Sequence, residues 1–168
     1  MRLPRQIEAD AQHDAIRMAL TARTRRLWSG GSLDVPVLAP SGAVFQAVRN
    51  AVRVGQLCRG IDPALRLLSN AEHSRTTLAA RGVAPPQGAA ISRLLLFAND
   101  GTARFYRQIE TALVRHAPRL AGCQVDCGSR AFGSAVYGGE AVAKLVMLQH
   151  KDAVSALLRA LVEEPAAP

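Results

Sequence analysis

The sequence predicts an α/β protein, a three-layer α-β-α sandwich with a small mixed sheet and an N-terminal helical extension. Leu94–Phe97 is a continuous apolar run, which is typical of a strand covered on both faces. In the second half of the chain, short apolar runs alternate with segments of helical apolar spacing. A chain of 168 residues, 49% of them hydrophobic, can fill one core. We expect an extension and linker over 1–38, the main domain over 39–164 and a tail over 165–168.

The N-terminal segment has the spacing of one amphipathic helix over 5–28. Its apolar positions are Ile7, Ala11, Ala15, Met18 and Leu27. The run Ser29-Gly30-Gly31-Ser32 ends this helix, and 34–40 is interpreted as a connection interrupted by proline. We expect the extension to dock on the domain or on a partner.

The main domain begins with two predicted helices. Ser41 is a suitable N-cap for a helix that ends at Gly55. After the apolar pair Leu57-Cys58, Asp62 as N-cap and Pro63 at the first helical position predict a second helix. From 72 to 90 the pattern becomes polar and contains Gly82 and Pro85-Pro86, so we expect an inserted loop there.

The second half predicts three strands, each followed by a helix. After Leu94–Phe97, the run Asn99–Thr102 caps a helix that closes near Pro118. Cys123–Val125 is a short strand, and Ser129 caps a short helix that ends at Gly138-Gly139. The last strand is expected over 142–148, and a final amphipathic helix over 152–161.

The charge of the chain favours a polyanionic partner. Its 21 basic and 13 acidic residues give a net charge of +8, and Lys144 and Lys151 are the only lysines. Arginine binds phosphate and base edges in bidentate fashion. The alternative is a GC-rich genome, which enriches Arg, Ala and Gly together. Aromatic residues make up only 4% of the chain, which argues against base stacking as the main mode of binding.

The three cysteines and the N-terminal segment indicate where in the cell the protein works and whether it binds a metal. Cys58, Cys123 and Cys127 are an odd number without secretory features, which indicates buried thiols in a reducing compartment. Their spacing is not that of a zinc site, so we expect no metal and no cofactor. We expect no membrane span and no signal peptide, and an intracellular protein, nuclear, nucleolar or cytoplasmic. A mitochondrial presequence stays open, because four arginines between 17 and 26 lie on a plausible amphipathic helix, although three acidic residues between 8 and 14 count against it.

Catalytic motifs are absent from the sequence. It contains no P-loop, no GxGxxG turn and no Gly-x-Ser-x-Gly elbow. Asp100 follows a strand, where open α/β sheets place catalytic acids, but it also precedes a helix, so a capping role is the simpler interpretation. Asp100 and His116 are the only candidates for chemistry, and we expect no enzyme.

An ordered set of short segments points to RNA. These segments are Val54-Gly55-Gln56, Arg59-Gly60-Ile61-Asp62, Ala98-Asn99-Asp100, Gly128-Ser129-Arg130-Ala131-Phe132-Gly133 and Ala141-Val142-Ala143. Together they resemble the kink-turn RNA-binding family, which includes the archaeal ribosomal protein L-seven-Ae, the box C/D and H/ACA core proteins and a subunit of RNase P and RNase MRP. The resemblance covers about residues 41–163. It implies an α-β-α sandwich in which the turn before the second helix of the domain enters the RNA.

The resemblance also implies which residues contact RNA. Gln56 stands where the family has Lys, Arg59 matches a basic residue, Gly60 matches the glycine of the turn, and Arg66 stands for Lys. Residues 140–143 would form the loop that caps a flipped-out nucleotide. The expected RNA-binding residues are Gln56, Arg59, Gly60, Ile61, Asp62, Arg66, Glu140, Ala141, Val142 and Ala143.

Two positions depart from the family pattern. Asp62 stands for Asn and lacks its amide donor, and Pro63 stands for Glu and makes no polar side-chain contact. Without these two contacts to base edges, the free-energy difference between the right and the wrong bases falls by about 2–6 kcal/mol. We therefore expect the turn to hold the RNA backbone more than it reads sequence.

The sequence thus predicts a non-catalytic RNA-binding subunit of a ribonucleoprotein, such as the ribosome, RNase P/MRP or a snoRNP, that binds a structured, kink-turn-like RNA. Its expected partners are structured RNA and other protein subunits, the latter through the N-terminal helix, with no membrane and no small-molecule substrate. The alternatives are a protein–protein scaffold that kept the fold but lost base readout, and, as the weakest, a small α/β enzyme.

Overall fold

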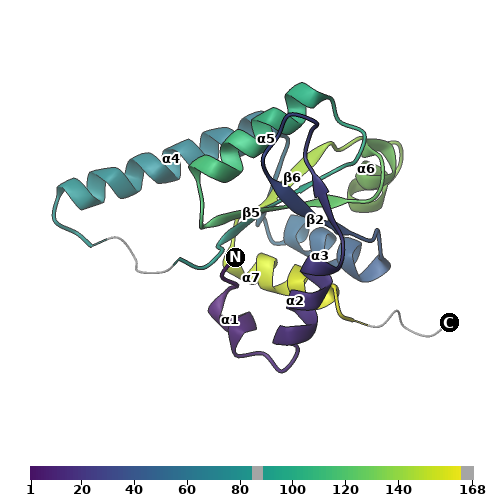
Figure 1. Ribbon diagram of the computed structural model, residues 1–168, viewed down its shortest axis with the longest axis horizontal. Coiled ribbons are helices and arrows are strands. Elements are labelled where there is room, and N and C mark those ends of the chain that lie inside the picture. The colour runs from purple at the N-terminus through teal and green to yellow at the C-terminus, as the bar shows by residue number, and fades with distance from the viewer. Residues whose placement is uncertain (85–88, 164–168) are drawn as a thin grey trace.

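A six-stranded mixed sheet forms the centre of the molecule (Figure 1). The computed structural model describes residues 1–84 and 89–163. The strands are β1 (Thr24–Arg26), β2 (Asp34–Leu38), β3 (Leu57–Arg59), β4 (Arg93–Phe97), β5 (Leu120–Val125) and β6 (Leu145–Leu148), in the spatial order β1-β2-β5-β4-β6-β3. β2, β5 and β4 run parallel to one another. β1, β6 and β3 pair antiparallel with their neighbours, so the sheet is mixed.

Helices cover both faces of this sheet, which confirms the predicted α/β sandwich. The helices are α1 (Arg5–Glu8), α2 (His13–Ala22), α3 (Gly42–Arg53), α4 (Ile61–Ala80), α5 (Ala103–Arg115), α6 (Ser129–Tyr137) and α7 (Lys151–Ala160). Because side chains alternate along a strand, Leu94 and Leu96 of β4 pack with α1, α2, α3, α6 and α7. Leu95 and Phe97 pack with α4 and α5 on the other face. The apolar run 94–97 is therefore buried on both sides, as its composition predicts.

Local capping signals placed several helix starts correctly. The Ser41 hydroxyl accepts a hydrogen bond from the Val44 N–H, 3.2 Å away, at the start of α3. The Thr102 hydroxyl caps α5 in the same way, through the Phe105 N–H at 3.3 Å. At α4, however, the predicted cap is wrong. Gly60 is the N-cap, with φ 92°, and Asp62 and Pro63 lie inside the first turn.

The N-terminal segment is not the single helix expected over 5–28. It forms α1 and α2, and then the backbone becomes extended at Arg23 and continues as β1. β1 pairs with the segment expected to be a connection, which is strand β2 and lies beside β5 through the pair Val37↔Gln124. This pairing joins residues far apart in the chain, so local periodicity does not reveal it.

The extension also packs on its own domain. Ile7, Ile16 and Leu20 are buried in the same core cluster as residues of α3 and α7. Asp10 accepts a hydrogen bond from Arg159 of α7 at 2.8 Å, whereas Met18, expected on the apolar face, is 71% exposed. The apolar face expected to be available to a partner is therefore largely used within the chain.

The loop expected over 72–90 is helical in its first part. α4 continues to Ala80 as a 20-residue helix. The hydroxyls of Ser74, Thr76 and Thr77 each donate to the carbonyl four residues earlier, at 3.0 Å, so these polar residues are satisfied within a helix. Residues 85–88 of the expected loop and the expected tail over 165–168 lie outside the described residues.

The last strand and its neighbours differ from prediction only in their ends. β6 begins at Leu145 rather than at 142, β5 begins at Leu120 rather than at Cys123, and α7 occupies Lys151–Ala160. Gly128, not Ser129, is the N-cap of α6. No helix in the described ranges is long and apolar enough to cross a membrane.

Candidate nucleic-acid interface

The turn between β3 and α4, residues 59–62, is called here the Arg59 turn. The Gly60 N–H donates to the Leu145 carbonyl at 2.9 Å, which ties the turn to the first residue of β6. The φ of Gly60 lies in the left-handed region, where a side chain would be strained. This sharp turn leaves Arg59 and Asp62 exposed at the start of α4.

Arg59 connects this turn to the 140–143 loop. Its Nη2 donates to the Val142 carbonyl at 2.6 Å, across a separation of 83 residues. The same guanidinium lies over the Tyr137 ring, 4.5 Å from its centroid. Burial raises the pKa of the Tyr137 hydroxyl, and the charge of Arg59 opposes that rise. The structure therefore brings together two segments that the sequence analysis selected separately.

The 140–143 loop is held tightly against α6. Ala143 N–H donates to the Ser129 carbonyl at 3.0 Å. A Cβ on Gly133 would lie 2.3 Å from the Ala141 carbonyl oxygen and 2.6 Å from the Ala143 nitrogen, so α6 approaches the loop backbone where only glycine fits. Consequently the loop has a defined position beside the Arg59 turn.

A hollow of about 420 Å³ lies between α6 and this loop. Its lining residues are Arg130, Ser134, Gly139, Glu140, Ala141 and Val142. Val142 thus belongs to the hollow and also accepts the Arg59 hydrogen bond. Arg130 and Glu140 place one cationic and one anionic side chain in the wall, which can donate to and accept from a polar ligand.

Not every predicted residue belongs to this surface. Gln56 lies at the other end of β3, where its carbonyl accepts a hydrogen bond from the Gln149 N–H at 2.9 Å. Three residues of strand separate it from Arg59 by about 10 Å. Arg66 is exposed on α4, just over one turn beyond Asp62. The surface therefore consists of the Arg59 turn, Arg66 and the 140–143 loop, without Gln56.

The start of α4 has mixed electrostatics. Gly60 provides no side-chain cap, so no side chain occupies the first N–H groups of the helix. The partial positive charge of a helix N-terminus attracts phosphate, but the carboxylate of Asp62 already lies in that first turn. Arg59 and Arg66 therefore supply the positive charge at this turn, and Asp62 opposes it.

The site also contains residues that the sequence analysis did not assign to it. Arg130 belongs to the segment 128–133 on which the family resemblance rests, and its place directly after Ser129, at the start of a predicted helix, could have indicated it as a site residue. Tyr137 had no signal, because its ring meets Arg59 only through the packing of α6 beside β3.

Asp100, the candidate catalytic acid, caps a helix, although not the one that follows it in sequence. Its Oδ2 accepts hydrogen bonds from the N–H and the hydroxyl of Ser129, both at 2.9 Å, at the start of α6. The Ser129 N–H in particular lowers the pKa of Asp100. His116 follows the last residue of α5, so the length of that helix, about 20 Å, separates it from Asp100.

The thiols lie in apolar surroundings. Cys123 is fully buried, which raises its pKa to about 12, and burial also raises the pKa values of Cys58 and Cys127. Within 1–84 and 89–163, no group of three or more His, Cys, Asp or Glu side chains is placed to hold a metal ion.

No protein-family model matches the sequence, and no curated protein matches it significantly. A solved structure of a protein with unknown function from Bacillus halodurans aligns with 73% of this chain and 100% of its own, at 11% identity and a TM-score of 0.46. A similarity of this degree carries no information on what either chain does.

Proposed function

We propose that this protein is a non-catalytic RNA-binding subunit of a ribonucleoprotein, which holds structured RNA on the Arg59 turn and the 140–143 loop. The observation that carries the proposal is the hydrogen bond from Arg59 to the Val142 carbonyl. It joins the two segments for which the sequence resemblance implies RNA contact, and so makes one continuous surface. The net charge of +8 agrees with a polyanionic partner.

Phosphate contacts supply most of the affinity in this proposal. Arg59 is exposed and uses one N–H on Val142, which leaves the rest of its fork for a phosphate oxygen. Arg66 adds a second exposed cation on α4. Asp62 and Pro63 contribute little base recognition, so affinity exceeds sequence specificity.

The hollow between α6 and the loop accepts an unstacked nucleotide. Its volume of about 420 Å³ lies within the range of small-ligand sites. Arg130 and Glu140 at its wall can donate to and accept from a base or a ribose hydroxyl. Recognition of splayed-out nucleotides is a common mode of RNA binding.

The test is a filter-binding titration over a range of salt concentrations, with a kink-turn RNA and a mismatched duplex of equal length. Combining Arg59→Ala with Arg66→Ala lowers affinity and reduces the salt slope by about one unit for each phosphate that the variant no longer neutralises. Arg17→Ala, an exposed charge on α2, is the matched control and leaves both unchanged. An unchanged slope in the double variant refutes the placement of the site.

Arg59→Ala also removes the bond to Val142, so two further variants separate charge from loop position. Arg66→Ala removes no hydrogen bond seen among the described residues, and therefore tests charge alone. Arg130→Ala tests the hollow. Kink-turn affinity reduced by Arg130→Ala, with duplex affinity unchanged, supports nucleotide capture there.

The scaffold alternative rests on one observation, the exposed Asp62 at the point where the resemblance implies base contact. Equal and weak affinity for both RNAs, unchanged in the arginine variants, favours that alternative over RNA binding.

A further inference from the structure

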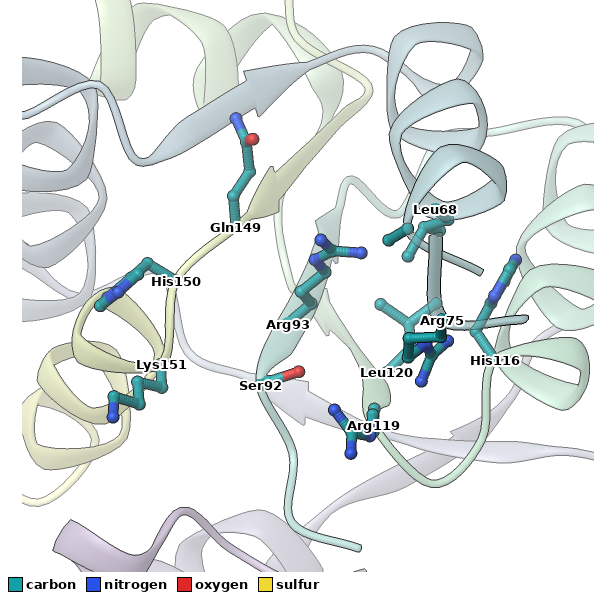
Figure 2. A pocket seen from close by; sticks show the side chains of 11 residues that line it. Leu68, Arg75, Ser92, Arg93, His116, Arg119, Leu120, Gln149, His150 and Lys151 are labelled. Carbon is teal, nitrogen blue, oxygen red and sulfur yellow. The ribbon is translucent and has the colours of Figure 1, made fainter. Parts of the chain in front are cut away.

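A second cavity lies at the opposite end of the sheet from the Arg59 turn. It has a volume of about 340 Å³ and is bordered by the start of β4, the start of β5, the end of β6 and the helices α4, α5 and α7. Gln149 follows β6 at this end, whereas Leu145 at the other end of β6 meets Gly60. We call it the arginine cavity, because Arg75, Arg93 and Arg119 lie around Leu120 in its wall (Figure 2).

The described wall of the arginine cavity contains cations without carboxylates. Besides the three arginines it contains Lys151 and the imidazoles of His116 and His150, and burial lowers the pKa of His116, which favours its neutral form. Neither Arg75 nor Arg93 forms a salt bridge with any of the described residues. Half-buried cations are normally paired, so two arginines of one wall that have no carboxylate partner among the described residues favour an anion from solution.

Two carboxylates lie near the arginine cavity, and both face its histidines rather than Arg75 or Arg93. Glu72 lies 3.1 Å from Arg115 and 3.9 Å from the His116 ring nitrogen. Asp152 lies 3.4 Å from His150, at the start of α7. Glu72 and Asp152 therefore lie against Arg115 and the two histidines of the wall, and not against Arg75 or Arg93. Burial, chiefly, and the charge of Arg75 lower the pKa of Arg93.

We propose that the arginine cavity binds the phosphate group of a small molecule that also has an apolar or aromatic part. Arg75 and Arg93 present guanidinium forks from α4 and β4 to one phosphate. Leu68, Ala71 and Leu120 form the apolar part of the wall and contact the rest of the ligand. A nucleoside monophosphate has this chemistry.

The shape of the site favours a small molecule over an RNA strand. Its cations come from separate segments, α4, β4 and the residue before β5, and converge on one concave site. A strand of RNA requires cations spread along a track at the spacing of its phosphates. The volume of about 340 Å³ fits a compact ligand. This inference goes beyond the proposed RNA binding, and it differs from the sequence-based expectation that no small molecule is bound.

The experiment is isothermal titration calorimetry of the full chain with AMP, with adenosine and with inorganic phosphate. AMP binds at one site, and adenosine, which lacks the phosphate, binds at least tenfold more weakly, a difference of about 1.4 kcal/mol. Inorganic phosphate binds more weakly than AMP, because it lacks the part that contacts the apolar wall. Arg75→Gln and Arg93→Gln each raise the Kd for AMP about tenfold or more.

Matched controls separate this site from the RNA surface. Arg104→Gln changes an exposed arginine of α5 outside the cavity and leaves the AMP Kd unchanged. Arg75 lies on helix α4, whereas Arg93 belongs to the central strand β4, so Arg75→Gln keeps the melting temperature even if Arg93→Gln does not. Arg66→Ala leaves AMP binding intact, and Arg75→Gln leaves RNA binding intact, so either proposal can fail alone.

Three results of the calorimetric titrations overturn the inference. They are the absence of AMP binding at millimolar concentration, equal affinity for AMP and adenosine, and a Kd for AMP that neither Arg75→Gln nor Arg93→Gln changes. Displacement of bound AMP by the kink-turn RNA also overturns it, because the cavity would then be part of the RNA surface.

Discussion

Replacing Gly133 with alanine tests how tightly α6 holds the 140–143 loop. In the interior of a helix this change normally stabilises a protein by about 1 kcal/mol, since alanine is the better helix former. Here the added Cβ would lie 2.3 Å from the Ala141 carbonyl oxygen, and real Cβ contacts below 3.0 Å are essentially never seen. The loop or the helix therefore has to move by about 0.7 Å to restore that distance.

The cost of this movement outweighs the gain in helix propensity. Overpacking a buried position costs about 1–3 kcal/mol, and the atoms in the way belong to the backbone rather than to a flexible side chain. Because backbone atoms yield less than a flexible side chain, we take the upper part of that range, about 2–3 kcal/mol. After the gain of about 1 kcal/mol is subtracted, we expect Gly133→Ala to destabilise the fold by about 1–2 kcal/mol. Displacement of Val142 also stretches its bond with Arg59, so RNA affinity falls as well.

Urea unfolding measures this change, and Gly42→Ala is the matched control. Gly42 is the first residue of α3, and a Cβ there meets nothing within 4 Å. The control is therefore neutral or slightly stabilising. If Gly133→Ala is as stable as the parent, or more stable, the close contact between α6 and the loop is refuted.

Two further substitutions test contacts that hold the two ends of the sheet. Glu110 accepts hydrogen bonds from the Ser32 N–H, chiefly, and from the Trp28 indole, and these lower its pKa from 4.5. Glu110→Gln is therefore less stable than the parent at neutral pH, and this difference in the free energy of unfolding shrinks as the pH falls below about 4.5 through the lowered pKa. Urea unfolding followed by the fluorescence of the single tryptophan measures it. An equal difference at about pH 7 and about pH 3 would contradict this reasoning. Asp100→Ala removes the carboxylate that accepts hydrogen bonds from the Ser129 N–H and hydroxyl at the start of α6. We expect it to lower the free energy of unfolding by about 1 kcal/mol in the same assay, and unchanged stability would argue against this capping role.

Much of the fold could be predicted because its signals are local. The run 94–97 is buried on both faces, as its composition indicates. The caps at Ser41 and Thr102 act within three residues of the helix start, so sequence alone places them. Two local signals at α4 gave wrong predictions. The N-cap is Gly60, at positive φ, instead of Asp62. The polar residues expected to form a loop belong to the helix as far as Ala80, because their hydroxyls donate to carbonyls within it.

The candidate site was predicted in its parts but not in its assembly. The turn and the loop were both selected from sequence, yet the hydrogen bond between Arg59 and Val142 spans 83 residues. Gln56 was assigned to the same surface, but the strand directs it to the other end of the sheet. Neither result follows from spacing along the chain, because both depend on how β3 pairs with β6.

The sequence by itself determined the α/β class, the buried central strand, the excess of arginine and the turn at Gly60. Only the tertiary structure decided that β2 joins the sheet, that the Arg59 turn meets the 140–143 loop, and that Arg75 and Arg93 face one cavity. The physical reason is range. Caps, periodicity and burial act over a few residues, whereas strand pairing and the convergence of charges depend on the packing of the whole chain.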